Sequence, residues 1–129
     1  MREIKFRGRK LVGEDAGKWA YGWLSTNIRG NPVIKDDNAQ FPVAVDVETV
    51  GQYTGMKNFN GTEIYDGDIV RTDDEDEELA IIEWGDDTLK FMVTHGNVCS
   101  DLGEYYPREI EVVGNIYDNP ELIGGGEND

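Results

Sequence analysis

The sequence has very little cysteine or histidine, and it has no long apolar run. Cys99 and His95 are the only residues of their types among 129. One cysteine excludes an internal disulfide and fits a reducing compartment. Zinc requires about four ligands, which this pair does not supply. No run approaches the ~18 apolar residues of a membrane span, and the first residues do not form a signal peptide. We therefore expect a soluble cytoplasmic protein without a zinc site.

Positive charge is also scarce, and it is unevenly placed. The chain has 12 Lys/Arg against 27 Asp/Glu, a net charge of −15. Residues 1–35 carry eight basic against three acidic residues, while residues 36–129 carry four against 24. A field of this sign repels phosphate, so direct nucleic-acid binding is not expected. The asymmetry has two interpretations, which are simple solubility and a basic N-terminal arm that meets the acidic body of a neighbouring subunit.

Long helices are missing from the pattern as well, and the remaining signal is that of strands and turns. About eight short apolar segments are expected to form strands, with turns every 8–12 residues. This spacing predicts a mainly β protein, a compact sandwich or barrel with an SH3-like small barrel in the C-terminal half. We expect one domain over 1–123, with an N-terminal β segment over 1–50, the barrel portion over 51–123 and a disordered tail over 124–129.

Alternation along the chain predicts the strands and the face on which their side chains lie. Ile4 and Phe6 alternate with charged residues, which predicts a first half-buried strand. The aromatics at 19, 21 and 23 fall on one face of an extended segment over 19–24. We expect that face in the core or at a subunit interface rather than stacked on bases or sugars. The alternation over 41–47 predicts another strand, and further strands are expected over 79–84, 89–94 and 110–113.

Glycines mark the turns of the central stretch, residues 51–70. Asn60-Gly61 predicts a hairpin with a type I′ turn, because both central residues of that turn need positive φ. Asp66-Gly67-Asp68 predicts a second sharp reversal. Residues 95–106 are expected to be irregular. A short helical turn is expected at Pro120, capped by Asp118 or Asn119.

Carboxylates are abundant, but their spacing does not match a specific cation site. An EF-hand loop needs oxygens at alternate positions and a glutamate at position twelve, and Asp66-Gly67-Asp68 runs directly into Ile69-Val70. The run Asp73–Glu78 is predicted to be a solvated loop that could gather calcium weakly. We therefore expect no metal-binding residues.

The sequence predicts no catalytic or cofactor-binding residues either. His95 and Cys99 lie four residues apart in one segment without an orienting third group, so we expect a surface histidine and a semi-buried cysteine. The segment Gly51–Gly55 lacks the lysine and the helix of a phosphate-binding loop. The chain is therefore not expected to be an enzyme or to hold a cofactor.

Five ordered stretches resemble the YopX family of phage and prophage proteins. These stretches are 2–8 and 19–24 at the start, 48–55 and 60–70 in the centre, and 112–122 at the end, three ordered blocks in all, and the resemblance covers 1–123. The resemblance implies a small, largely β protein of the bacterial host cytoplasm whose molecular function is unassigned. It supplies no site residues to carry over. The acidic insert at 72–78 and the tail at 124–129 depart from the family pattern.

Two functions of different class remain compatible with the sequence. The first is an oligomeric interaction or assembly module that acts on an unidentified host or phage protein. The alternative is an acidic decoy that imitates DNA and occupies a host nucleic-acid-binding protein. A decoy needs carboxylates spread regularly over one face, and six of the 24 acids in 36–129 lie in one segment. The sequence therefore favours the assembly module.

Overall fold

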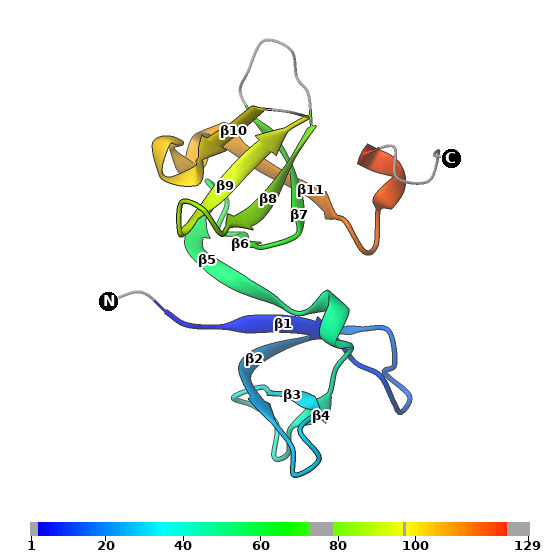
Figure 1. Cartoon of the computed structure of the whole chain (residues 1–129). Coiled ribbons are helices and arrows are strands. Elements are labelled where there is room, and N and C mark those ends of the chain that lie inside the picture. Colours follow the sequence, from blue (N-terminus) through cyan, green and yellow to red (C-terminus); the bar gives the residue numbers. More distant parts are fainter. Residues whose placement is uncertain (1–2, 73–78, 97, 124–129) are drawn as a thin grey trace. The chain divides into compact units, whose positions relative to one another are not determined.

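The computed structural model describes residues 3–72, 79–96 and 98–123, and these form strands joined by short turns (Figure 1). In this part of the chain there are eleven strands and four 3₁₀ helices of three or four residues. The mainly β prediction is confirmed. The strand number exceeds the predicted figure of about eight because β4, β6 and β10 are too short, or too poor in apolar residues, to give a clear alternation.

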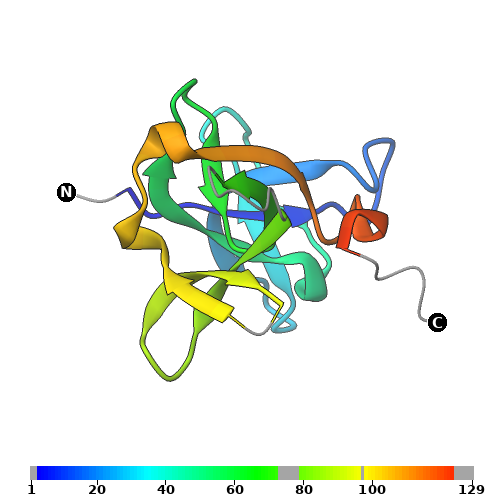
Figure 2. The same cartoon turned by 90° about the horizontal axis from the view of Figure 1, so that it is seen from above.

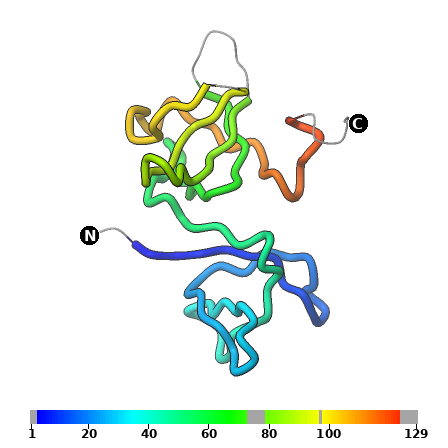
Figure 3. Tube along the Cα trace, viewed as in Figure 1, coloured from blue at the N-terminus to red at the C-terminus, as the bar shows by residue number. Residues whose placement is uncertain are grey.

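The chain divides into two compact units, Met1–Tyr53 and Thr54–Asp129. Both sheets are antiparallel. One sheet has the order β4-β3-β2-β1-β5-β6 and the other has the order β10-β9-β8-β7-β11. The boundary between the units falls within β5. Figure 3 traces the course of the chain by residue number. The predicted domain limits, with a break at 50/51, stay a prediction.

Unit 1 is built on the β1–β2–β3 meander. Its core contains Ala20, Ile34 and Val45, with half-buried apolar side chains packed around them. Gly8 lets β1 lie against this core, since a Cβ atom there would stand 3.1 Å from the Cβ of Val45. The elements are β1 (Phe6–Arg9), β2 (Trp19–Thr26), β3 (Pro32–Lys35), β4 (Val43–Ala44), the 3₁₀ helix η1 (Val47–Thr49) and β5 (Gly51–Lys57).

Two strand predictions in unit 1 need correction. The first strand starts at Phe6, and Ile4 is exposed ahead of it. The predicted strand over 41–47 shrinks to β4, followed by a single bridge from Val45 to Lys10. The chain leaves the extended conformation because the Asp46 carboxylate accepts a hydrogen bond from the Glu48 N–H and caps η1.

Unit 2 packs its sheet around eight buried side chains. Its elements are β6 (Glu63–Tyr65), β7 (Asp68–Thr72), β8 (Leu79–Gly85), β9 (Lys90–His95), β10 (Val98–Asp101), η2 (Leu102–Glu104), η3 (Pro107–Glu109), β11 (Ile110–Asn115) and η4 (Pro120–Ile123). The β8–β9 hairpin and β10 are labelled in Figure 1, and Figure 2 draws the same strands from above. The core consists of Ile64, Val70, Ala80, Ile82, Phe91, Val93, Leu102 and Ile110.

Two predictions for unit 2 differ from the structure. Residues 95–106 are not wholly irregular, because β10 pairs with β9 over four residues and η2 follows it. The five-stranded sheet is open in the described residues, with β10 and β11 at its edges, so a closed SH3-like barrel is not confirmed. The short helical turn at Pro120 is confirmed, and the Leu122 N–H donates to the Asn119 carbonyl.

The central stretch forms the predicted hairpin with a different turn. The Gly61 N–H donates to the Asn58 carbonyl, so Phe59 and Asn60 are the central residues. Gly61 follows them at φ +86°, while Asn60 does not have positive φ. This is a three-residue loop built on a type I turn with a left-handed glycine after it, and the type I′ prediction is wrong. Gly67 adopts φ +94° in the second reversal, as expected.

Candidate functional site

His95 and Cys99 are not brought together as a nucleophile and its base. In the β9–β10 register His95 lies opposite Val98, and Cys99 lies opposite Thr94. The Cys99 Sγ is 3.5 Å from the Thr94 Oγ1, which itself donates to Glu83 at 2.8 Å. The thiol therefore donates to that hydroxyl. Cys99 is exposed and His95 is half-buried, the reverse of what the sequence predicted.

The described residues contain no group of three or more histidine, cysteine or carboxylate side chains that could hold a metal ion. Asp68 is buried, and its carboxylate accepts a hydrogen bond of 2.7 Å from the Tyr65 N–H across the second reversal. That contact gives it a structural role in the turn. The acidic run 73–78, for which a weak calcium site was considered, lies outside the described residues.

The local structure changes the electrostatics of the Asp101 carboxylate. Its Oδ1 accepts a hydrogen bond from the Gly103 N–H at 2.9 Å, and its Oδ2 lies 3.0 Å from the Lys90 ammonium. These two contacts, the backbone N–H first, lower the pKa of Asp101 below its ordinary value. Asp101 also caps η2, so this side chain stabilises a turn of unit 2 rather than forming a reactive site.

The β2–β3 hairpin of unit 1 turns large aromatic side chains outward. Ala20 and Leu24 belong to the core, and the alternate residues Trp19, Tyr21 and Trp23 lie on the opposite face of β2. The prediction that these aromatics share one face is consistent with this pattern. Trp23 is 62% exposed and Tyr21 is 40% exposed, so these two are not part of the core.

Cations accompany this aromatic face along its length. The Arg7 guanidinium lies 4.8 Å and the Arg9 guanidinium 5.5 Å from the centre of the Trp19 ring. Lys35 stands directly opposite Trp23 in the β2–β3 register. The twenty residues 16–35 contain no carboxylate side chain, the longest such stretch in the chain. The hairpin is thus an apolar and cationic surface on an otherwise acidic protein.

Two hairpin loops of the chain, one in each unit, have the same construction. In the first, residues 27–31, the Asn27 N–H donates to the Asn31 carbonyl and the Asn27 carbonyl accepts from the Gly30 N–H. The Asn27 Oδ1 also accepts from the N–H groups of Arg29 and Asn31. In the second, Asn58 makes the same bonds to the residues two, three and four positions later. Three positions after each asparagine comes a glycine with positive φ, Gly30 at +85° and Gly61 at +86°. Such asparagine-capped turns are rigid for their length.

Each of these loops presents one large apolar side chain directly after its asparagine. Ile28 is fully exposed in the first loop, and Phe59 is 63% exposed in the second. Neither side chain belongs to a core cluster of the described residues. Sequence reasoning missed both of them. The signal was present as a repeated pattern of asparagine, apolar residue, any residue and glycine.

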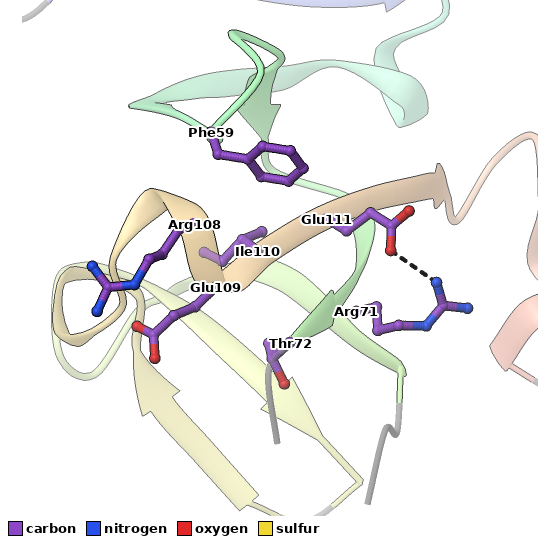
Figure 4. A pocket seen from close by; sticks show the side chains of 7 residues that line it. All are labelled: Phe59, Arg71, Thr72, Arg108, Glu109, Ile110 and Glu111. Carbon is purple, nitrogen blue, oxygen red and sulfur yellow. Dashed lines mark hydrogen bonds and ion pairs between the residues drawn. The ribbon is translucent and has the colours of Figure 1, made fainter. Parts of the chain in front are cut away.

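Phe59 lies over a hollow of about 290 Å³ on the surface of unit 2 (Figure 4). We call this space the Phe59 hollow. In the view of Figure 4 the phenyl ring lies toward β11, the strand that carries Glu111 and the buried Ile110. Glu111 pairs with Arg71 of β7 at 2.9 Å, and both side chains are about half exposed. The full lining is Phe59, Arg71, Thr72, Arg108, Glu109, Ile110 and Glu111.

A second hollow of unit 2, of about 410 Å³, lies beside η4. Aliphatic side chains dominate its lining, which is Leu79, Ile81, Thr94, Gly96, Leu122 and Ile123. It brings no titratable group together with a nucleophile. Both hollows of unit 2 therefore offer surfaces for contact.

The model of the YopX protein family matches residues 12–124, most of the chain. The chain belongs to the YopX family. This confirms the resemblance drawn from the sequence blocks. No curated protein sequence matches the chain.

Two solved structures show the same fold as this YopX family chain. One is protein EF1440 from Enterococcus faecalis, with a TM-score of 0.59 and 19% identity, covering 95% of this chain and 99% of that chain. The other is protein yopX from Bacillus subtilis, with a TM-score of 0.52 and 22% identity, covering 95% of this chain and 96% of that chain. At these identities the likeness carries the fold alone.

The comparisons leave the molecular activity of the family open. Neither family description nor structure name states a reaction, a ligand or a partner. Within the described residues, no helix of the YopX family chain is long and apolar enough to cross a membrane. Function therefore has to be argued from the surfaces described above.

Proposed function

We propose that this YopX family protein is a non-enzymatic interaction and assembly module that self-associates through the β2–β3 hairpin of unit 1. In this proposal the protein is encoded by a phage or prophage and acts in the cytoplasm of its bacterial host. The observation that carries the proposal is the exposure of Trp23 and Tyr21 on the outer face of an acid-free hairpin.

Exposed aromatics of this kind are costly to leave in water and are enriched at the centre of protein interfaces. A tryptophan buries a large area with few rotatable bonds, so it contributes strongly to affinity once it is covered. Lys35, which lies opposite Trp23, and Arg29 in the hairpin loop supply positive charge, and the next carboxylates in the sequence are Asp36 and Asp37. Both properties suit a partner surface that is apolar at its centre and acidic around it.

A second copy of the chain offers such a surface. The described residues of unit 2 carry four Lys/Arg against twelve Asp/Glu. Opposite charges on two parts of one chain favour association between copies, because each copy then provides both sides of the contact. We also propose that unit 2 resembles an SH3-like small barrel. The support is the short 3₁₀ helix η3, which directly precedes β11, the last strand of the unit.

The proposal is tested by the mass of the wild-type protein in solution and of a Trp23→Thr variant. Threonine suits an exposed strand position, so the fold should be kept while the aromatic contact is lost. Light scattering at tens of micromolar should give a wild-type mass above that of one chain and a lower mass for the variant. Phe41→Thr is the matched control, because Phe41 is 69% exposed in the same unit outside the hairpin.

Charged residues of the hairpin should also affect the self-association equilibrium. We expect Lys35→Glu and Arg29→Glu to weaken association and to reduce its dependence on salt. Arg7 is unsuited to this test, because it is buried and stacked on Trp19, so a reversal there would disturb folding. A wild-type mass of one chain at all concentrations would refute the proposal, and an oligomer indifferent to salt and charge would remove its electrostatic part.

A further inference from the structure

We propose that Asn60 is a site of spontaneous covalent modification, deamidation through a cyclic imide with Gly61, and that Asn58 of the same loop restrains this reaction. The inference concerns the hairpin loop 58–62 of unit 2 and goes beyond the proposed self-association. Asn60 is the one asparagine of the chain that a glycine follows. Glycine favours ring closure because it has no side chain to hinder the approach of its nitrogen.

The reaction needs only water in addition to the groups of the loop. The Gly61 nitrogen loses its proton to solvent base and forms a bond to the Asn60 Cγ, and the carboxamide nitrogen leaves as ammonia. One water molecule then opens the five-membered succinimide. Attack at Cγ gives aspartate, and attack at the main-chain carbonyl gives isoaspartate, in which the chain runs through Cβ and Cγ. The net change is the loss of ammonia and the gain of water.

Solvent reaches both reacting residues. Asn60, Gly61 and the following Thr62 are exposed. A Cβ atom on Gly61 would meet no atom within 4 Å, so the surroundings leave room for the ring to form. Access of water and base therefore does not limit the reaction, and its rate depends on the conformation of the loop.

The folded loop engages the two groups that have to react. The Gly61 N–H donates to the Asn58 carbonyl at 3.1 Å, so the proton that has to leave takes part in the turn. The carboxamide oxygen of Asn60 accepts from the Thr62 hydroxyl at 3.0 Å, which ties this side chain to the loop. The first of these bonds has to break before the nitrogen can attack Cγ. The reaction therefore proceeds through the fraction of molecules in which the loop is open.

Asn58 keeps the loop closed. It is 7% exposed, and its Oδ1 accepts from the N–H groups of Asn60 at 3.1 Å and Thr62 at 2.9 Å. Its own N–H donates to the Thr62 carbonyl at 2.9 Å. Loss of a single hydrogen bond of this kind changes an equilibrium about fivefold. Removal of the Asn58 carboxamide therefore raises the open fraction and, with it, the rate of modification at Asn60.

Modification changes the charge and the length of the loop. Aspartate or isoaspartate adds one negative charge to a chain of net charge −15. Isoaspartate also adds one carbon atom to the main chain between residue 60 and Gly61. The hydrogen bond from Gly61 to Asn58 spans only three residues, so the longer main chain does not preserve it. The exposed Phe59, which lies inside this turn, is then no longer held as it is in the unmodified loop.

The experiment follows the full chain at mildly alkaline pH by peptide mass spectrometry, which reads a gain of about one dalton at residue 60. Modification of the wild type should be about tenfold or more faster in concentrated urea than in the folded protein. Folded Asn58→Ala should react about fivefold or more faster than the folded wild type. Hydrogen exchange of the Gly61 N–H should rise by a similar factor, since both processes need the same opening.

The other asparagine-capped loop, residues 27–31, supplies the matched controls. Asn27→Ala removes the same cap there and should leave the rate at Asn60 unchanged. Arg29→Asn places an asparagine before Gly30, which has almost the same φ as Gly61, and should create a second slow site. Adding Asn27→Ala to Arg29→Asn should accelerate that second site. Asn58→Asp keeps an oxygen acceptor in place and should keep the wild-type rate at Asn60.

Each part of the inference can fail separately. An unfolded chain that is not modified at Asn60 would overturn the site. Equal rates for the folded and the urea-unfolded wild type would overturn the restraint by the loop. A wild-type rate in Asn58→Ala would overturn the role of Asn58. If circular dichroism shows that this variant does not fold, the pair of variants in loop 27–31 decides, and equal rates with and without Asn27→Ala would overturn the role of the cap.

Discussion

Gly61 shows how one residue determines the course of the central hairpin. It adopts φ +86°, and a Cβ atom at this position would meet no atom within 4 Å. Space is therefore available, and the requirement for glycine comes from the backbone conformation alone. The sequence identified the correct residue and hairpin but assigned the wrong turn, because the side chain of Asn58 captures two N–H groups of the loop.

We predict that Gly61→Val lowers the free energy of unfolding by about 1–2 kcal/mol or more, since valine at positive φ is strained. Gly61→Asn is the matched control and should cost much less, because asparagine tolerates the left-handed region. Urea unfolding of both variants checks this. Equal losses would show that the backbone conformation of Gly61 does not decide the outcome.

Asp101 gives a prediction about titration. The Gly103 N–H and the Lys90 ammonium lower the pKa of the Asp101 carboxyl, so it titrates below 3.8 in the folded protein. A lowered folded pKa means that the stabilisation is present above the unfolded value and is lost as the pH falls through the folded one.

Removing the ammonium should raise the Asp101 pKa only part of the way. We expect Lys90→Met to move the NMR titration midpoint of Asp101 upward, while the Gly103 N–H still holds it below the ordinary value. A midpoint that does not move would show that Lys90 contributes nothing in solution. Lys57→Met, a change at another exposed lysine, serves as the control.

At the scale of elements, alternation predicts a strand well where neighbouring strands extend the pattern. β8, β9 and β11 lie where apolar alternation places them. The alternation at 41–47 is equally strong, yet Phe41 and Val47 are exposed because Asp46 starts a 3₁₀ helix. Capping of this kind depends on backbone geometry that periodicity does not encode. β10 has little alternation and forms because β9 offers it a free edge.

Gly22 provides a test of the β2–β3 element. A Cβ atom at this position would stand 2.1 Å from the Lys35 carbonyl oxygen, so any side chain forces the two strands apart. We expect Gly22→Ala to lower the free energy of unfolding by several kcal/mol or to prevent folding of unit 1, through overpacking against backbone. Circular dichroism during urea unfolding measures it.

The comparison for Gly22 is Gly30→Ala. Gly30 also has positive φ, but nothing lies within 4 Å of its Cβ position. This change should lower the free energy of unfolding by only about 1 kcal/mol, because alanine is strained at positive φ but meets no other atom there. Similar losses for both variants would contradict the close approach of β2 and β3.

At the scale of the whole molecule, the candidate surfaces could be inferred only in part from the sequence. The aromatic face of β2 follows from a period of two, and its cationic setting follows from the absence of acids in 16–35. The exposure of Trp23 does not follow, because periodicity gives a face without saying which face is covered. The Phe59 hollow was unpredictable, because it combines residues from 59 to 111 that only tertiary structure brings together.

The net charge of −15 also belongs to this scale. We predict that replacing Asp73–Glu78 with a neutral Gly/Ser segment keeps the fold and does not lower stability, because like charges repel one another in the compact state. Thermal unfolding followed by circular dichroism measures this. A loss of folded signal would show that the six carboxylates are required, for example by holding a cation.

Self-association through the β2–β3 hairpin is the central claim, and the mass of the wild-type protein in solution tests it most directly. One chain has a mass of 14.5 kDa. Sedimentation velocity from about 1 to 100 micromolar should show a weight-average mass that rises above this value with concentration and falls back toward it in Trp23→Thr. A mass of one chain over the whole range, for the wild type as for the variant, would contradict the claim.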